Sequence, residues 1–312
     1  MLQDISPLNR IDVRFSTYIA NRKADENGHM VNGVPDYSFD LDNELRQKLN
    51  NIPGFVSLSK KICATIAARQ IQLVNQSGLA VGPNQFPEIY EMAVDCARKL
   101  GIGVPNVFVE NNPVMNAYTI ASDDVSPIIV LYSGIVERLT PGELKCVIAH
   151  ECGHIHNQHA IYKVVIDEIL NSGTGTLGTI LSVANIALMQ FWTRAGEITA
   201  DRAALICADN VEDAENVNKK LLYGAMINTD YKVNVEALRE QLEVTLNNPT
   251  KIYEVLSDHP NSIRRVLAEK EFEECEVFYK WRPELKRPGM TMRTKEATEI
   301  RCKKLVNILD NK

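Results

Sequence analysis

The chain has 312 residues, of which 45% are hydrophobic and 24% are charged. Its formal net charge of −6 at pH 7 supplies no basic field, so the composition excludes nucleic acid as a partner. A chain of this length can bury one large core, or a core and a smaller domain. The seven cysteines are scattered and odd in number, without the paired spacing of a zinc knuckle. They argue against a disulfide framework and favour a reducing compartment such as the cytoplasm.

The first third of the chain divides into an irregular segment and a run of helices. Residues 1–40 are polar and are interrupted by Gly28, Gly33 and Pro35, so we expect an arm or a lid there. A loop rich in Gly and Pro is expected over 78–87. Helices are predicted over 41–51, 56–76 and 87–100, and three short strands follow the last of them.

The second half of the chain is predicted to be mostly helical. Its expected helices cover 212–226, 234–246, 261–280 and 294–310. A few strands among many helices are typical of an α+β fold, here mainly α.

One helix between the strands and these later helices carries a motif. Residues 150–154 read His-Glu-Cys-Gly-His. The helix is expected to begin with a capping box, because Thr140 precedes Pro141 and is followed three residues later by Glu143. The apolar residues that continue from this start make the helix amphipathic.

This motif has the spacing of a metal site. Residues i and i+4 share one helix face, so His150 and His154 can direct two imidazoles to one point, where they suit Zn²⁺. Glu151 lies about 100° around the helix, where it can reach a water on the metal without ligating the metal. The pattern predicts metal-assisted hydrolysis of a peptide bond.

A third protein ligand is needed, because a catalytic zinc ion normally has three and keeps one open position. The helix-favouring segment 192–204 offers Glu197, with Asp201 one turn further on the same face. Glu197 would complete a His₂Glu site, and Asp201 could accept the remaining ring N–H of a ligand histidine. The alternative is an exposed face on which both carboxylates are only solvated, or are paired with Arg194 and Arg202.

These motifs, in this order, resemble those of the soluble relatives of the CAAX prenyl protease and HtpX heat-shock protease family of zinc metallopeptidases. The resemblance covers about residues 86–270 and includes the segments 105–109, 128–131 and 134–136. The motif residues that match are His150, Glu151, His154, Glu197 and Asp201, together with Ala149 and Gly153.

The resemblance implies a zincin-like metallopeptidase core, with a small mixed sheet and additional helices, that binds one zinc ion per chain. We therefore divide the chain into an N-terminal arm and helical region, 1–85, and a zincin-like metallopeptidase domain, 86–312. In the family, the segment that matches Asn116, Ala117 and Tyr118 is an edge strand beside the cleft. An extended polypeptide substrate is expected to lie against it.

Two further residues have roles implied by the resemblance. His259 matches a histidine that lies close to the metal, where it contacts substrate or occupies the open zinc position and silences the enzyme. It could instead only cap the helix that begins near Asn261. Arg265 could stabilise the oxyanion or bind a substrate carboxylate, or it could only pair with Asp258.

The other two histidines near the motif are expected to have different surroundings. His156 lies two residues past a ligand, on the opposite helix face, and is expected to be exposed. His159 is expected to be a packing residue or to support a ligand from behind.

These residues predict a zinc metalloendopeptidase that acts on extended or unfolded polypeptide, in protein quality control or processing. Glu151 would act as the general base and then carry the proton to the leaving amine. Two alternatives stay open: a proteolytically latent zinc protein that serves as a binding or chaperone-like module, and a zinc hydrolase that acts on something other than peptide. The sequence does not define the oligomeric state.

Residues 169–193 contain no charge, which raises the question of a membrane span. Membrane members of the family place spans between the two halves of the site. A lone span here would put Glu197 and His150 on opposite sides of a bilayer, so we predict a loop over 171–179 and a buried helix from about 180. A cytoplasmic protein with peripheral membrane contact through 171–192 is compatible with this pattern.

Overall fold

The computed structural model describes residues 28–122, 125–160, 162, 166, 183–223, 234–246 and 262–306. Within these ranges helices predominate, and the strands form a four-stranded sheet and a small hairpin. The prediction of an α+β, mainly α fold is confirmed.

The larger sheet is mixed. Its strands are β3 (Leu79–Ala80), β4 (Asn106–Glu110), β5 (Ala117–Ser122) and β6 (Val125–Tyr132). Their order is β3-β4-β6-β5, in which β4 and β6 are parallel and the other pairs antiparallel. β6 lies between two strands and is buried from residue 126 to residue 131. β5 lies at an edge.

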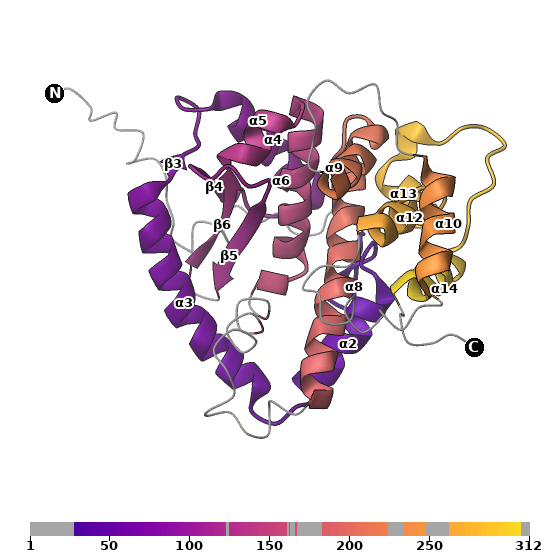
Figure 1. Ribbon diagram of the computed structural model, residues 1–312, viewed down its shortest axis with the longest axis horizontal. Helices are drawn as coiled ribbons and strands as arrows, with labels where there is room; N and C mark the ends of the chain where they lie inside the picture. The colour runs from indigo at the N-terminus through magenta and orange to yellow at the C-terminus, as the bar shows by residue number, and fades with distance from the viewer. Residues whose placement is uncertain are drawn as a thin grey trace.

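Helices cover both faces of this sheet (Figure 1). On one face, α3 (Phe55–Ser77) packs its buried residues against Ile120, Ile128 and Val130. On the other face, α4 (Pro87–Leu100) and α6 (Pro141–His156) pack against Ile129 and Leu131. Alternate side chains of a strand point to opposite faces, so this arrangement explains the apolar run Ile128–Leu131 within β6.

α6 begins as the sequence predicts. It follows the short helix α5 (Ser133–Arg138). The Glu143 N–H donates to the Thr140 hydroxyl oxygen at 3.3 Å, and the Thr140 N–H donates to the Glu143 carboxylate at 2.8 Å. This capping box fixes where the helical register starts, and the register brings His150 and His154 onto one face.

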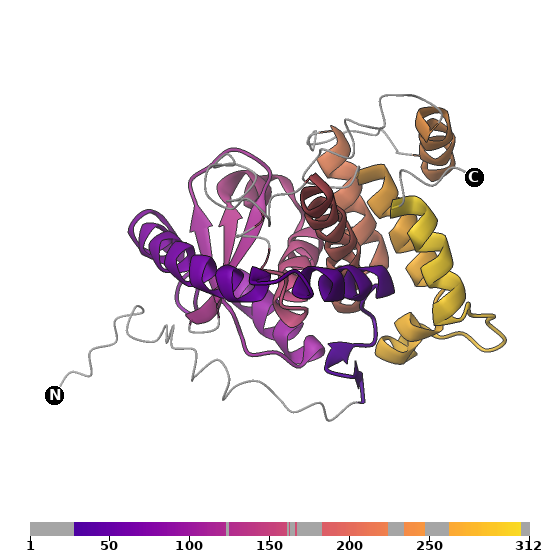
Figure 2. The same cartoon turned by 90° about the horizontal axis from the view of Figure 1, so that it is seen from below.

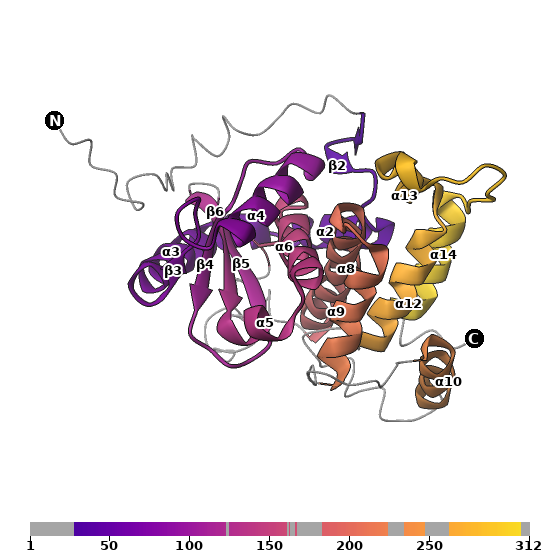
Figure 3. The same ribbon diagram turned by 90° about the horizontal axis from the view of Figure 1, so that it is seen from above.

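α8 (Val183–Cys207) packs closely along α6, as Figure 3 shows. The two helices approach at Gly153 of α6. A β-carbon at this position would lie 2.7 Å from Ala203 Cβ and 3.0 Å from Ala200 Cα. Glycine at 153 is therefore required by the close approach of α8, and the approach brings Glu197 towards the motif histidines.

Replacing Gly153 by Val should lower the free energy of unfolding by about 1–3 kcal/mol, because overpacking at this contact forces α6 and α8 apart. Urea denaturation followed by circular dichroism measures the change. Gly82→Val is the matched control, since a β-carbon at position 82 meets no atom within 4 Å. Equal stability of the Gly153→Val variant and the wild-type protein would show that the helices are not this close.

Most of the remaining helices lie on the side of α8 away from the sheet, whereas α9 (Val211–Tyr223) packs against both α6 and α8 (Figure 1). Among them, α12 (Ser262–Glu273) packs against α8, α9, α10 (Val235–Leu246) and α14 (Lys295–Val306). The helix predicted over 261–280 is divided in two around residues 274–275. These elements are α9 (Val211–Tyr223), α10 (Val235–Leu246), α12 (Ser262–Glu273), α13 (Glu276–Trp281), a 3₁₀ turn (Pro283–Leu285) and α14 (Lys295–Val306).

The segment before residue 40 has more structure than its composition suggests. β1 (Met30–Val31) and β2 (Val34–Pro35) form the hairpin, and Tyr37 and Phe39 behind it are fully buried. The expectation of an irregular arm or lid is therefore wrong for residues 28–39, because these aromatic side chains have a core to enter. Residues 1–27 lie outside the described residues.

α2 (Asp40–Asn50) continues from this segment and lies against α8 (Figure 2). Its Leu45 and Leu49 share a core with Trp192 of α8 and Val306 of α14. Elements on both sides of residue 85 therefore pack together. The boundary placed there from the sequence stays a prediction.

None of the helices in the described part of the chain is both long and apolar enough to cross a membrane. The helix predicted from about residue 180 is present as α8 from Val183. Of the segment 171–192 that we singled out for membrane contact, residues 171–182 lie outside the described residues.

Candidate metal centre

Three side chains from two helices converge between α6 and α8. The His150 and His154 Nε2 atoms lie 3.1 Å apart. The Glu197 carboxylate lies 3.4 Å from the first nitrogen and 3.5 Å from the second. The structure thus brings together the three residues that the sequence marked as metal ligands, with their ligand atoms within 4.8 Å of one another.

These distances suit coordination of a metal ion. Zinc bonds nitrogen and carboxylate oxygen at about 2.0–2.2 Å, which makes the ligand atoms of a tetrahedral site about 3.3–3.6 Å apart. The observed separations of 3.1–3.5 Å are close to these values. Two imidazoles and a carboxylate also match the donor set of a catalytic site that keeps its fourth position open. The residues present therefore fit a zinc ion.

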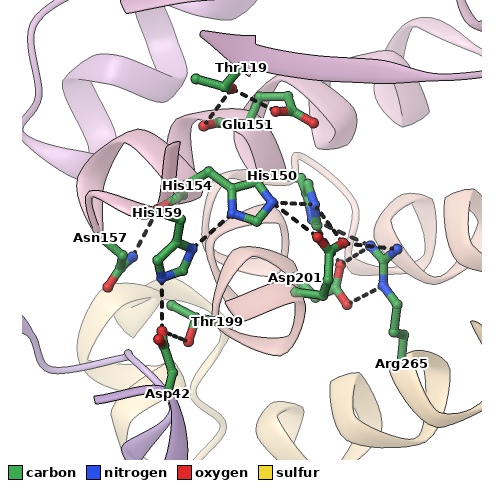
Figure 4. Close-up of polar contacts among 12 residues, drawn as sticks. Asp42, Thr119, His150, Glu151, His154, Asn157, His159, Thr199, Asp201 and Arg265 are labelled. Carbon is green, nitrogen blue, oxygen red and sulfur yellow. Dashed lines mark hydrogen bonds and ion pairs between the residues drawn. The ribbon is translucent and has the colours of Figure 1, made fainter. Parts of the chain in front are cut away.

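Asp201 lies behind His150, where the sequence predicted a supporting carboxylate. His150 Nδ1 lies 3.0 Å from Asp201 Oδ1, so the Nδ1–H donates there and Nε2 faces Glu197 (Figure 4). Arg265 of α12 donates to both oxygens of Asp201, from Nε at 2.8 Å and from Nη2 at 2.5 Å. This two-point contact fixes the carboxylate, and through it the ring of His150.

The charges of this cluster favour a cation between the ligands. Burial alone would raise the pKa of Asp201, but the Arg265 guanidinium holds that pKa below its usual range. Burial alone would lower the pKa of His150, but the carboxylates of Asp201 and Glu197 raise it to about 9. The two buried carboxylates therefore stabilise positive charge at this position.

Arg265 lines the cavity of the site, but its guanidinium is directed to Asp201 and, at 3.5 Å, to Glu197. Its contact with substrate stays a prediction. Its alternative partner Asp258 and the predicted site residue His259 both lie outside the described residues.

The Glu151 side chain lies at the same cavity and has a partner that sequence reasoning missed. The Thr119 hydroxyl, from β5, donates to Glu151 Oε2 at 2.6 Å (Figure 4). Glu151 is buried, so this contact ties the carboxylate to the edge strand. Thr119 follows directly on Asn116, Ala117 and Tyr118, but no local pattern links it to a residue 32 positions later.

A cavity of about 240 Å³ opens beside His150, Glu151 and Glu197. Asn116 and Ala117 line it at the start of β5, whereas α9 and α12 close its far side. Tyr118 does not face this cavity. Its ring lies on the other face of the sheet, against Tyr132, and its hydroxyl donates to Glu110 at 3.4 Å.

His154 is supported by a second histidine. Its Nδ1 lies 2.8 Å from Nδ1 of His159, and Nε2 of His159 lies 2.9 Å from Asp42 of α2. Burial alone would raise the pKa of Asp42, but its contacts with His159 and Thr199 hold that pKa below its usual range. His159 thus lies behind a ligand, as expected from the sequence, but its partner Asp42 was not foreseen.

The expectation that His156 is exposed is wrong. Its ring is only 8% exposed, and Nδ1 lies 3.1 Å from the Tyr37 hydroxyl. His156 does lie away from the metal face of α6. However, the segment before α2 covers that side of the helix. Nothing in the sequence around the motif predicts that this segment packs there.

Two histidines one turn apart, a glutamate from a second helix and a buried Glu151 beside them are the residue set found in metallopeptidases of the His-Glu-x-x-His class. Comparison with known proteins agrees, because the model of "Peptidase family M48" matches residues 83–272. The chain belongs to peptidase family M48. The resemblance stated from the sequence motifs is confirmed.

Similar proteins include the plastoglobule-localized metallopeptidase 48, chloroplastic, of Arabidopsis thaliana. It is 33% identical over 210 residues, which cover 66% of this chain and 60% of that protein. A protease HtpX homolog of Persephonella marina is 30% identical over 109 residues, 35% of this chain and 34% of that protein. The chain thus spans less than two thirds of either relative. Among solved structures, S. mikatae Ste24p matches with 16% identity and a TM-score of 0.36, over 74% of this chain and 65% of that one.

Proposed function

We propose that the protein is a zinc-dependent endopeptidase that cleaves extended or unfolded polypeptide, in protein quality control or processing. One ion per chain would be held by His150, His154 and Glu197. The observation that carries the proposal is the convergence of these three ligands beside Glu151, at a cavity that reaches the edge of the sheet.

When bound, zinc would polarise the substrate carbonyl and lower the pKa of water to about 7. The residues of the chain transfer the protons and orient the groups that take part. Glu151 accepts the proton of the attacking water and delivers it to the leaving amine. Thr119 holds the Glu151 carboxylate for both transfers, and Asp201 with Arg265 holds the ring of His150.

The edge strand supports an extended substrate. The Tyr132 N–H donates to the Asn116 carbonyl at 3.1 Å, so Asn116 and Tyr118 turn their backbone groups to β6. By the alternation of an antiparallel pair, Ala117 and Thr119 turn theirs to the other side. No strand in the described part of the chain pairs with that side. A substrate strand could therefore add there by backbone hydrogen bonds, which select for chain shape over sequence.

Removal of the metal should abolish cleavage. We expect the purified protein to contain one zinc per chain by elemental analysis and to digest an unfolded casein. Treatment with a chelator should end digestion, and added zinc should restore it. Cleavage that continues in the metal-free protein would contradict the proposal, whereas a zinc-loaded protein without cleavage would favour the latent binding module.

Replacing Thr119 by Val should lower kcat by about 10-fold or more, because it removes the hydroxyl that orients Glu151 and keeps the shape of the side chain. Initial rates of casein digestion measure the effect. Thr65→Val is the control, since the Thr65 hydroxyl donates only to a backbone carbonyl within α3. An unchanged kcat would remove Thr119 from the proposed mechanism.

We also propose a reducing, cytoplasmic location, because all seven cysteines are buried as thiols and none is joined to another by a disulfide. Peripheral membrane contact through 171–192 stays a prediction.

A further inference from the structure

Behind His154, away from the cavity, a series of hydrogen bonds runs from α6 to α2 (Figure 4). His154 Nδ1 meets His159 Nδ1 at 2.8 Å, and His159 Nε2 meets Asp42 Oδ2 at 2.9 Å. The Thr199 hydroxyl donates to the same Asp42 oxygen at 2.8 Å. All four side chains are at least nine-tenths buried.

The order of partners in this series of hydrogen bonds determines which ring nitrogens of His154 and His159 carry protons. An ionised carboxylate can only accept, so the proton of a neutral His159 is on Nε2, where it donates to Asp42. Nδ1 of His159 is then an acceptor, and the His154 Nδ1 opposite it must carry the proton of that ring. In this tautomer the lone pair of the His154 ring lies on Nε2, the atom that points towards Glu197.

The opposite arrangement would disable the ligand. If His159 carried its proton on Nδ1, it would donate to Nδ1 of His154, and the proton of His154 would then lie on Nε2, the atom that faces His150 and Glu197. A protonated Nε2 cannot bind a metal ion. The identity of the group at position 42 therefore decides which atom of His154 is available.

We infer that Asp42 is a positioning residue of the metal centre, which acts through His159 to hold His154 in the tautomer that presents Nε2 to the ion. This inference rests on the proposed ligation by His154. It gives α2 a part in the site, although Asp42 lies outside residues 83–272, which match the family model.

The surroundings hold Asp42 in place. Thr199, which donates to Asp42, accepts a hydrogen bond from the Phe39 N–H at 3.1 Å, so α8 anchors the start of α2. At the other end, the Arg46 guanidinium donates to the Asn157 carbonyl at 2.9 Å, just past α6. These contacts hold the C-terminal end of α6 and the start of α2 together. The two ends carry the hydrogen-bond series from His154 through His159 to Asp42, which we call the relay. The ring of His150 needs no intermediate residue of this kind, because Asp201 contacts it directly.

The experiment compares zinc affinity among variants of the full chain, measured by competition with a chromophoric chelator. His159→Phe keeps a ring against Trp192 and removes the acceptor for His154. Asp42→Leu removes the carboxylate. We expect each to weaken zinc binding by about 10–100-fold, the usual effect of losing the partner of a ligand histidine. The double variant should be no weaker than the single ones, because both changes break the same relay.

Two further variants separate positioning from packing. His159→Asn can place a carbonyl oxygen near the position of Nδ1, where it accepts from His154 without help from Asp42, so it should retain zinc affinity within about threefold of wild type. Glu215→Leu is the control for loss of a buried carboxylate, since Glu215 pairs with Lys219 at 2.8 Å, outside the relay. It should lower stability in urea and leave zinc affinity unchanged.

The outcomes distinguish this inference from the proposed function. His154→Ala must lose zinc if the proposed site is right, and normal zinc binding by that variant would overturn both. If His154→Ala loses zinc but His159→Phe and Asp42→Leu bind it as wild type does, only the relay fails. Additive losses in the double variant would also overturn the relay, because Asp42 would then act by another route.

Discussion

Glu151→Gln should bind zinc with wild-type stoichiometry and lose about 10²–10⁴-fold in kcat, the usual contribution of a general base. The amide keeps the size of the side chain and can still accept from Thr119, whose hydroxyl lies 2.6 Å from Glu151 Oε2. It cannot accept the proton of water. Initial rates on unfolded casein and elemental analysis of zinc measure the two effects separately.

The control for this substitution is Glu137→Gln, since Glu137 is exposed on α5. It should cleave at the wild-type rate. If Glu151→Gln also retained that rate with zinc bound, another group would have to accept the proton. If it lost zinc, Glu151 would support the ion rather than the reaction.

Glu197→Ala should lose both the metal and the activity. Without the carboxylate only two histidines would hold the ion, and the several kcal/mol that a metal contributes to the transition state correspond to about 10³-fold or more in rate. Glu197 is 2% exposed, so solvent would not easily replace its carboxylate. We expect zinc content to fall towards zero and cleavage to reach the background.

Glu212→Ala tests the specificity of this effect, because Glu212 is exposed at the start of α9. It should keep its zinc. Full zinc content and activity in Glu197→Ala would show that the third ligand comes from elsewhere. The predicted site would then lack its link between α6 and α8.

The parts of the site that the sequence predicted depend on local spacing. The capping box at Thr140 and the i, i+4 relation of His150 and His154 are properties of one helix, and the helix alone determines the geometry. Glu197 and Asp201 share a face of α8 for the same reason. The order of the two motifs, which resembles that of the family, then suggested that α8 faces α6.

The parts that could not be predicted depend on contacts between distant segments. Asp42 meets His159 across 117 residues, and Thr119 meets Glu151 across 32 residues, with no periodic pattern around either partner. The error at His156 has the same origin. The helical geometry placed it correctly away from the metal face, but the segment that buries it was expected to be irregular.

If His150 and His154 hold the ion as proposed, the docking of α2 beside them links metal binding to folding in both directions. An ion that binds only the folded arrangement stabilises every contact on which that arrangement depends, so saturating zinc would protect the start of α2 from local opening. By the same thermodynamic reciprocity, anything that detaches α2 would weaken the hold on the ion by an equal free energy. The rate of hydrogen exchange at the amides of this helix would then report the fraction of molecules that have the metal bound.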